Sequence, residues 1–530
     1  MYTMFLVLSG RRPRSSPSRA ADTKQGFARA DASGAGTHPR LAAAVCLPLL
    51  LSCGVASAAA RIDPRLAAEA VAGPVEALIE LRAKASDVPL DPALAPLARR
   101  RLWVDLLRAT ATESQRDLIA WLDAQRIDHE AFWIANVVKV RADRAALEAI
   151  ATRADVVAVE ADRTTRSVPV QTPAVAAGGH RGIEWGVERI RAPLAWAAGI
   201  RGAGVVVAGA DTGYQWDHPA LRAAYRGWNG SSVVHDHHWY DGVRTPIGSG
   251  SGPCGAASPA PCDDHGHGTH TMGTMLGDDG GANAIGVAPE ARWIACRNMD
   301  RGNGRPSTYI GCTQWFLAPT DLAGGDPRPD LAPDIVNNSW ACPPSEDCLA
   351  PDVLLESVEN AVRGGLFFVV AAGNSGPACQ TIDAPPAIYA ASFVVGGSNE
   401  AGRMYGGSSR GPIPGLAEIK PDVIAPAESV RSSVPDDGYT WMTGTSMAAP
   451  HVAGTAALMI SVNPALRGRP ERIAAILRET AVPLTTTAQV CGGVAADVFP
   501  NPVQGHGQID AWAAVRFADT LFAEGFDTAR

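Results

Sequence analysis

The amino-acid sequence predicts an α/β protein in which helices cover both faces of a parallel sheet, preceded by a small α+β domain. From residue 183 on, short continuous apolar runs alternate with segments of helical periodicity, as in strands that are buried on both faces of a sheet. Residues 61–166 alternate strand and helix patterns and contain none of the ten cysteines. Residues 167–182, rich in Thr, Pro, Ala and Gly, show no periodicity and are expected to form an exposed, cleavable linker.

Residues 1–60 are expected to be a signal or targeting segment. Arg40 is followed by twenty uncharged residues, Leu41–Ala60, in which small residues follow a short apolar run. A charge, a short apolar segment and small residues for cleavage are typical of a secretory signal. Leu50–Cys53 also resembles a bacterial lipoprotein cleavage box, so a lipid-anchored or periplasmic location through Cys53 is the alternative.

Residues 61–166 are expected to form a ferredoxin-like sandwich with helices on one face of an antiparallel sheet. Asp143 can cap the helix that follows it. The expected elements, in chain order, are strand Val75–Leu81, helix Leu102–Leu122, strand Phe132–Val140, helix Arg144–Ala151 and strand Val156–Glu160.

Residues 183–530 are expected to hold the main sheet, and in such folds the site lies at the carboxyl ends of the strands. The strand candidates are Val205–Ala210, Trp293–Ala295, Ile335–Val336, Leu366–Ala372 and Phe393–Val395. The helix candidates are Leu354–Val362, Ser446–Ile460 and Glu471–Thr480.

Charge and cysteine content limit the class of protein. A net charge of −8 without a basic stripe argues against a nucleic-acid surface. Eight cysteines lie between Cys254 and Cys491, which indicates disulfides and an oxidising compartment, although buried thiols are the alternative. Short loops rich in Pro, Gly or Ser predict the pairs Cys254–Cys262 and Cys342–Cys348. Cys296–Cys312 and Cys379–Cys491 are choices by elimination among the remaining pairings.

The stretch Gly444–Gly454 sets a serine hydroxyl among small residues, and apolar residues continue to Ile460 at helical spacing. At a helix start, Ser446 would have free amide N–H groups and the positive end of the helix dipole beside its oxygen. Such a place suits a nucleophile whose reaction develops negative charge. Pro450 is expected in the first helical turn, where it needs no N–H partner. The alternative is a small-residue turn before a buried helix.

Two further segments can supply a carboxylate and a base. Val205–Gly213 predicts a buried strand that ends on Asp211, although a single aspartate there is often structural. Asp263–His270 combines acids and histidines with glycines, which fit a tight turn into a helix that exposes the imidazole of His267 as a general base. A zinc site that uses the neighbouring histidines is the alternative, but no second ligand cluster is evident in the sequence.

A fourth segment, Leu366–Gly376, predicts a buried strand that ends on the amide of Asn374. An asparagine between glycines is often a turn residue. Its N–H group can also point at a developing oxyanion.

Together, in this order, the four segments resemble the subtilisin-like serine proteases, or subtilases. The matching pieces are Ala210–Gly213, His267–His270, Ala372–Ser375 and Gly444–His451. A closer likeness to the bacillopeptidase F type rests on Gln215–Leu221, Asp263–His267 and Val336–Trp340. The resemblance covers about residues 182–515, and residues 74–166 look like the inhibitor-type propeptide of the family.

The resemblance implies a role for each matching residue. Ser446 would attack the scissile carbonyl, His267 would take its proton, and Asp211 would hold the imidazole in the right tautomer. Asn374 and the Ser446 N–H would stabilise the oxyanion. The uncharged walls of an apolar or permissive substrate pocket would be Ser339, Trp340, Ala341, Ala371, Ala372 and Gly373.

The resemblance implies a secreted serine endopeptidase that is made as a self-processing zymogen and acts as a monomer on protein or peptide substrates. Its own propeptide would be an intramolecular inhibitor, and no nucleic acid partner is expected.

Catalysis would need no cofactor or metal. Structural calcium is compatible with the family, but its ligands are not identified, and Ala220 stands where many subtilisins have a calcium-binding aspartate.

An inactive binding protein that keeps the fold is the alternative in another class. A zinc hydrolase using His265, His267 and His270, and an acid-acting peptidase with a glutamate base, are the alternatives in mechanism.

Overall fold

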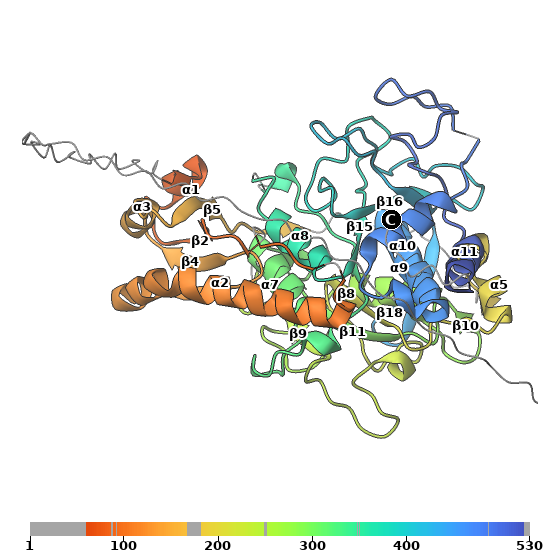
Figure 1. Ribbon diagram of the computed structural model, residues 1–530, viewed down its shortest axis with the longest axis horizontal. Coiled ribbons are helices and arrows are strands. Elements are labelled where there is room, and N and C mark those ends of the chain that lie inside the picture. Colours follow the sequence, from red (N-terminus) through yellow and green to blue (C-terminus); the bar gives the residue numbers. More distant parts are fainter. Residues whose placement is uncertain are drawn as a thin grey trace, which may run out of the picture. The chain divides into compact units, whose positions relative to one another are not determined.

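The computed structural model describes residues 60–85, 88–91, 93–166, 182–247, 252–346, 348, 350–485 and 487–523. The predicted signal segment, except for Ala60, and the predicted linker, except for Gly182, lie outside these residues. Residues 57–530 belong to one compact unit, so the two predicted domains pack against each other. The small domain, residues 61–166, is drawn in orange in Figure 1 and contacts helices of the large domain, residues 183–530.

The large domain is built on a parallel sheet of seven strands in the order β17-β16-β15-β14-β8-β11-β9. The strands are β8 (Val206–Asp211), β9 (Trp239–Asp241), β11 (Arg292–Arg297), β14 (Ile335–Asn338), β15 (Phe367–Ala371), β16 (Phe393–Ser398) and β17 (Val423–Pro426). The predicted parallel sheet is confirmed. The short strands β9 and β17 were not predicted.

Helices cover both faces of this sheet, as predicted. Along β8, Val207 belongs to one core cluster and Ala208 to the other, because successive side chains of a strand point to opposite faces. The first cluster takes in α4 (Trp185–Arg189), α5 (Ala192–Ala197), α6 (His267–Leu276), α9 (Thr445–Val462), α10 (Pro470–Glu479) and α11 (Ala511–Ala523). The second takes in α7 (Pro306–Leu317) and α8 (Leu355–Arg363).

The small domain has a five-stranded sheet in the order β1-β5-β2-β4-β3. Its elements are β1 (Arg61–Ile62), α1 (Pro64–Glu69), β2 (Val75–Leu81), α2 (Pro96–Gln125), β3 (His129–Phe132), β4 (Val137–Ala142), α3 (Arg144–Ala151) and β5 (Val156–Ala161). From β2 to β5 the element order is β-α-β-β-α-β, which is the order of ferredoxin-like folds. As expected, the Asp143 carboxylate caps α3 by accepting the Ala146 N–H at 2.9 Å.

One predicted strand of the small domain is wrong. Residues 132–140 are not continuous, because a turn at residues 133–136 separates β3 from β4, and Asn136 has a positive φ of 49°. Apolar residues run through this turn because Ile134 and Ala135 are buried against the large domain. The continuous apolar run therefore reflects a domain contact rather than one strand.

Short strands join distant parts of the chain. β6 (Thr165–Arg166), at the end of the small domain, pairs antiparallel with β13 (Asn303–Gly304), which pairs with β12 (Met299–Asp300). β7 (Gly182–Ile183) pairs with β10 (Asn283–Ala284), and β18 (Val430–Val434) forms a hairpin with β19 (Gly438–Met442).

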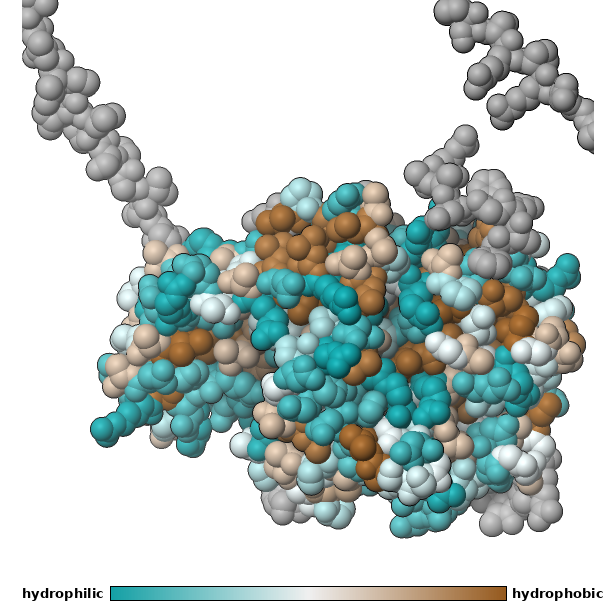
Figure 2. Space-filling model, turned by 60° about the horizontal axis from the view of Figure 1, so that its bottom comes forward, coloured by the Kyte–Doolittle hydropathy of each residue, from teal (hydrophilic) through white to brown (hydrophobic). Residues whose placement is uncertain are grey.

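Within the described ranges, no helix has the length and apolar character that crossing a membrane requires. The face in Figure 2 is largely hydrophilic, with apolar patches between the polar areas.

Candidate active site

The side chains singled out from the sequence meet at one edge of the main sheet. Asp211 is the last residue of β8, Ser339 follows β14, and Asn374 lies just beyond β15. Helix α6 begins at His267, and Ser446 is the second residue of α9. Because parallel strands end at a common edge, and α6 packs on α9 beside it, five segments from distant parts of the chain converge here.

Asp211 and His267 form a fully buried pair. The Nδ1 of His267 lies 2.7 Å from Oδ1 of Asp211, and both side chains are at most 1% exposed. Since an ionised carboxylate only accepts, the imidazole carries its proton on Nδ1 and donates it to Asp211. The backbone N–H of Thr212 also donates to this oxygen at 2.8 Å, and the Thr271 hydroxyl donates to the other at 3.4 Å.

The environment of His267 favours its protonated form. Burial opposes a charged imidazolium, but the adjacent Asp211 carboxylate outweighs burial and raises the pKa of His267 above its ordinary value of 6.5. Asp263 adds to the same effect. The Nε2 atom of His267 is buried and has no hydrogen-bond partner among the described residues, so it is available to accept a proton.

Ser446 lies in the first turn of α9, where backbone N–H groups have no partner within the helix. Its hydroxyl donates to the carbonyl of Ser339 at 3.1 Å, and the side chain is largely buried. It therefore does not donate to His267 in this conformation. Hydrogen bonds between a nucleophile and its base are often absent without substrate and form only in the reacting complex.

The expected position of Pro450 in the first helical turn is wrong, because Pro450 is the sixth residue of α9. A proline has no N–H, so the Ser446 carbonyl four residues earlier lacks its helical donor. The Ser339 hydroxyl takes that place and donates to the Ser446 carbonyl at 2.9 Å. The proline thus allows Ser339 and Ser446 to bind each other twice across the site.

The amide of Asn374 is oriented by the residue before Ser446. Its Oδ1 accepts the backbone N–H of Thr445 at 2.8 Å and the Thr445 hydroxyl at 3.1 Å. Both bonds use the amide oxygen. The NH₂ group makes no hydrogen bond to the described residues and remains a donor toward the site.

Five of the six expected wall residues line one small cavity of about 20 Å³ beside Ser446. The complete lining is Ser339, Trp340, Ala341, Ala371, Gly373, Asn374, Thr445 and Ser446, and it carries no charged group. Ala372 is not part of the lining. Its side chain packs into the core on the α7 and α8 side, since Ala371 and Ala372 point to opposite faces of the sheet.

The other two histidines of the motif are not placed to share a metal with His267. His270 is fully buried, and its Nε2 lies 3.1 Å from the Val430 carbonyl and 3.2 Å from the Thr440 carbonyl. Burial lowers the pKa of His270 to about 3, so it is neutral and donates to those carbonyls. Across the described ranges, no three His, Cys, Asp or Glu side chains are grouped to hold a metal ion.

The loop beside Ala220 does not fit a structural calcium ion. The Ala220 carbonyl accepts the Asp278 N–H at 3.0 Å, so the loop that follows α6 packs here. The Asp279 carboxylate is occupied by protein donors, namely the Gly281 and Asn283 backbone N–H groups and the Asn283 amide. The Arg431 guanidinium donates to Oδ1 of Asn283 at 2.6 Å and thus brings a positive charge to the loop.

The structure contains the four disulfides that were expected. They are Cys254–Cys262, Cys296–Cys312, Cys342–Cys348 and Cys379–Cys491, with Cα–Cα distances of 5.5–5.7 Å. The first one closes the loop immediately before Asp263.

The sequence pattern alone assigns no role to Asp263, which lies in the Asp263–His267 motif. Its carboxylate accepts hydrogen bonds from the segments of both Asp211 and His267. The signal that could have identified it is an aspartate four residues before the histidine of a helix start, where acceptors for free N–H groups are favoured.

A parallel α/β fold with a buried aspartate–histidine pair, and a serine in the first turn of a helix at the same sheet edge, is an arrangement found among serine peptidases. A profile of the subtilase family matches residues 202–507. The chain belongs to the subtilase family, the subtilisin-like serine proteases.

Three relatives illustrate the extent of the likeness. Bacillopeptidase F of Bacillus subtilis (strain 168) is 35% identical over 466 residues, which are 84% of this chain but only 30% of that protein. The major intracellular serine protease of the same strain is 32% identical over 278 residues, 52% of this chain and 74% of that protein. Subtilisin Savinase of Lederbergia lenta is 32% identical over 284 residues, 53% of this chain and 86% of that protein.

Proposed function

We propose that this protein is a secreted serine endopeptidase, made as a self-processing zymogen, that hydrolyses peptide bonds with Ser446, His267 and Asp211. The observation that carries the proposal is the buried Asp211–His267 pair, at 2.7 Å, which converges with Ser446 at one sheet edge. An inactive binding protein would have no need to bury this pair at the cost of desolvating it.

In the reaction, the Ser446 hydroxyl turns from the Ser339 carbonyl toward His267 and attacks the scissile carbonyl carbon. The free Nε2 of His267 takes the hydroxyl proton as the bond forms and later gives it to the leaving amine. Asp211 accepts the Nδ1–H throughout, which fixes the tautomer and stabilises the imidazolium. Water then hydrolyses the acyl-enzyme by the same steps in reverse order.

The negative oxygen of the tetrahedral intermediate lies against two donors. One is the backbone N–H of Ser446, which has no helical partner in the first turn of α9. The other is the NH₂ group of Asn374, since Thr445 already holds its oxygen. The substrate side chain enters the uncharged cavity beside Ser446, and we expect a permissive preference without selection for a basic residue.

Residues 61–166 act as the inhibitory propeptide, and their contacts with α7 and α8 support this role. The Asp162 carboxylate accepts the Ser307 N–H at 2.9 Å and the Ser307 hydroxyl at 2.6 Å, at the N-terminus of α7. Arg100 donates to the Gly364 carbonyl at 2.8 Å, at the C-terminus of α8. An acid at a helix N-terminus and a base at a helix C-terminus both stabilise the contact.

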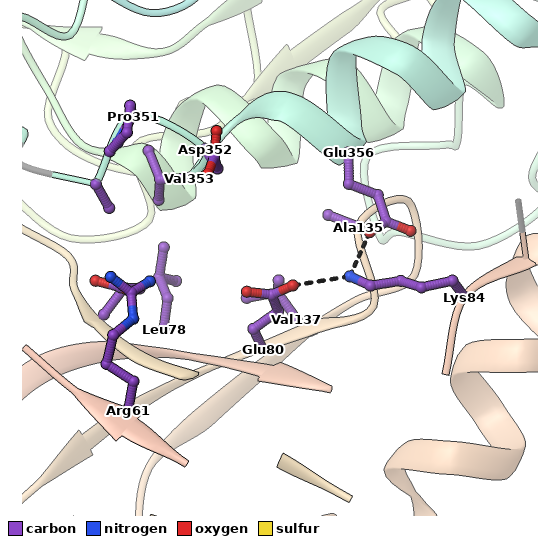
Figure 3. A pocket seen from close by; sticks show the side chains of 12 residues that line it. Arg61, Leu78, Glu80, Lys84, Ala135, Val137, Pro351, Asp352, Val353 and Glu356 are labelled. Atoms are coloured by element: carbon purple, nitrogen blue, oxygen red, sulfur yellow. Dashed lines mark hydrogen bonds and ion pairs between the residues drawn. The ribbon is translucent and has the colours of Figure 1, made fainter. Parts of the chain in front are cut away.

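A group of ion pairs lines a cavity of about 150 Å³ between the two domains. Lys84 of the small domain extends between Glu80 of its own sheet, at 3.0 Å, and Glu356 of α8 (Figure 3). At the other side of the cavity, Arg61 pairs with Glu160 at 2.5 Å. Of these pairs, Lys84–Glu356 is the one that joins the two domains, and it adds an ion pair to the contact made by Trp103, whose indole N–H donates to the Asn360 carbonyl at 3.0 Å.

The tail of the propeptide supports cleavage by the enzyme itself. Thr165–Arg166 pairs antiparallel with Asn303–Gly304, and the buried Thr165 hydroxyl lies 2.8 Å from the Tyr309 hydroxyl. The Tyr309 ring stacks at 3.9 Å on Trp340, which lines the cavity beside Ser446. The tail is thus bound as a substrate-like strand, and we expect the first cut among residues 167–182, before the peptidase part at 183–530.

Secretion is supported by the signal-like pattern of residues 1–60 and by four disulfides, which form in oxidising compartments. The mature enzyme would then lack the signal segment, residues 1–60, and the propeptide, residues 61–166.

Labelling with a fluorophosphonate probe tests the proposed chemistry, because the probe reacts only with an activated serine. The wild-type enzyme should be labelled on the peptide that contains Ser446, and heat-denatured enzyme or Ser446→Ala should not. Chelators should leave labelling intact. Failure of folded, propeptide-free enzyme to react would favour the inactive binding protein, and loss of hydrolysis on chelation would favour a metal hydrolase.

A further inference from the structure

The carboxylate of Asp263 joins the two segments that carry the proposed base and its partner. On one side, Oδ1 accepts the Thr212 hydroxyl at 2.9 Å, and Thr212 is the residue next to Asp211. On the other side, Oδ1 accepts the Gly266 N–H at 2.8 Å, directly before His267. One oxygen atom therefore fixes the distance between the end of β8 and the start of α6.

The second carboxylate oxygen extends this connection into the first turn of α6. Oδ2 accepts both the backbone N–H of Thr269 at 3.0 Å and its hydroxyl at 2.6 Å. The Thr269 hydroxyl oxygen accepts the Gln215 N–H at 3.0 Å, and the Thr212 hydroxyl oxygen accepts the Gly268 N–H at 3.0 Å. The loop and the helix are thus linked on both sides of Asp263.

The contact between these segments is too close for side chains. A Cβ atom on Gly268 would lie 2.1 Å from the Gly213 carbonyl oxygen, and one on Gly213 would lie 1.8 Å from the Cys262 carbonyl oxygen. The Cys254–Cys262 disulfide holds the segment directly before Asp263. Because the backbones are in contact, a shift of the Asp263 segment would be transmitted to both Asp211 and His267.

We infer that Asp263 is a positioning residue, which keeps the His267 imidazole aligned on Asp211 by joining the loop after β8 to the first turn of α6. The inference rests on the proposed function of His267 and extends it to a residue outside the triad. The charge of Asp263 also acts on His267, whose pKa it helps to raise. The other titratable groups near His267 are Asp211, His265, with its ring at 6.4 Å, and His270.

Replacing Asp263 by Asn keeps the size of the side chain but removes its charge. The amide has one acceptor oxygen, which would have to serve the donors of both the loop after β8 and the start of α6. Misalignment of a catalytic group by about 1 Å can cost roughly 10²-fold in rate, so we expect kcat to fall by up to about 10²-fold with KM nearly unchanged. His267 must be neutral to act as a base. Loss of the nearby negative charge lowers its pKa, so the acidic limb of the pH–rate profile should move to lower pH.

The comparison uses mature enzymes, which are freed from their propeptides by immobilised wild-type enzyme and checked for folding by circular dichroism. Asp217→Asn is the matched control, because Asp217 is an exposed acid in the loop after Asp211 and its charge does not act on His267. The kcat and the acidic limb of this control should equal those of the wild type. A histidine NMR titration should show the lower His267 pKa in Asp263→Asn directly.

The inference would be overturned if the folded Asp263→Asn enzyme had the kcat of the wild type. It would also be overturned if neither the acidic limb of its pH–rate profile nor the His267 pKa measured by NMR differed from the wild type. If that variant fails to fold, Thr212→Val is the second test, because it removes the hydrogen bond from the Thr212 hydroxyl to Asp263 and retains the Asp263 charge. For Thr212→Val, a lower kcat at unchanged KM, with an unmoved acidic limb, would support the inference. A wild-type kcat in this variant would overturn it. Absence of fluorophosphonate labelling in the wild type would instead mean that the proposed function itself has failed.

Discussion

At the residue scale, the site depends on which hydrogen-bonding groups are left without their usual partners. Pro450 removes the N–H that would bind the Ser446 carbonyl, and the Ser339 hydroxyl uses that carbonyl instead. Thr445 holds the amide oxygen of Asn374 and so leaves its NH₂ group for the substrate. In the reaction that we propose, the Asn374 donor is therefore in place before substrate arrives, whereas the Ser446 hydroxyl has to turn.

Replacing Asn374 by Ala tests the proposed oxyanion donor. The amide bonds the oxyanion of the transition state better than the ground-state carbonyl, so kcat should fall by about 10²–10³-fold, as is typical of losing one such donor in a subtilisin. KM should stay nearly constant. Steady-state kinetics on a peptide substrate measures both, and an increase in KM alone would mean that Asn374 binds substrate and transition state equally.

The residues for which we propose chemical roles could be singled out from the sequence because their types and order are specific, and because strand ends of a parallel sheet meet at one edge. The side chains that align them were harder to predict. Asp263 acts through hydrogen bonds whose partners lie in two segments, and no periodicity reports such bonds. The family resemblance implies Ala372 as a wall residue, but Ala372 lies outside the lining of the cavity because Ala371 and Ala372 point to opposite faces of the sheet.

At the element scale, the N-terminus of α7 and the C-terminus of α8 each contact a charged side chain of the small domain. Asp162 lies at the N-terminus of α7, and Arg100 lies at the C-terminus of α8. Free N–H groups of α7 and free carbonyls of α8, which would otherwise face water, are thereby satisfied by the small domain. The sequence predicts a single strand where the structure has the hairpin β3–β4, because the turn carries apolar side chains that are buried against the large domain. A contact of that kind leaves no turn signal in the local sequence.

Replacing Asp162 by Ala should weaken the binding of the cleaved propeptide. Loss of a carboxylate at a helix N-terminus costs about 0.5–2 kcal/mol, which corresponds to a weakening of roughly 2- to 30-fold. After self-cleavage, less propeptide should co-elute with the peptidase in size-exclusion chromatography. Asp143→Ala is the matched control, because Asp143 caps α3 within the propeptide and is exposed. Equal retention in both variants would contradict the proposed contact.

At the scale of the whole molecule, one chain holds the small domain that we propose as inhibitor, a tail that pairs as a strand with the large domain, and the site that we propose to cut the chain after this tail. The core cluster on one side of the main sheet includes Trp103 and Phe132 of the small domain together with Tyr309 and Phe368 of the large one. The parallel sheet could be predicted from its buried apolar runs. The shared core could not, because helix periodicity alone does not say which domain a buried face contacts.

The mass of the secreted protein tests the central proposal, that Ser446 cleaves its own chain, most directly. Ala is small and favours helices, so Ser446→Ala should fold with little loss of packing. Intact-mass measurement in a host without other extracellular proteases should give a wild-type protein that begins within residues 167–182. The Ser446→Ala protein should retain its propeptide and be longer by roughly a hundred residues, the span from residue 61 to the linker. If Ser446→Ala instead matures to the wild-type mass, self-processing by Ser446 is contradicted.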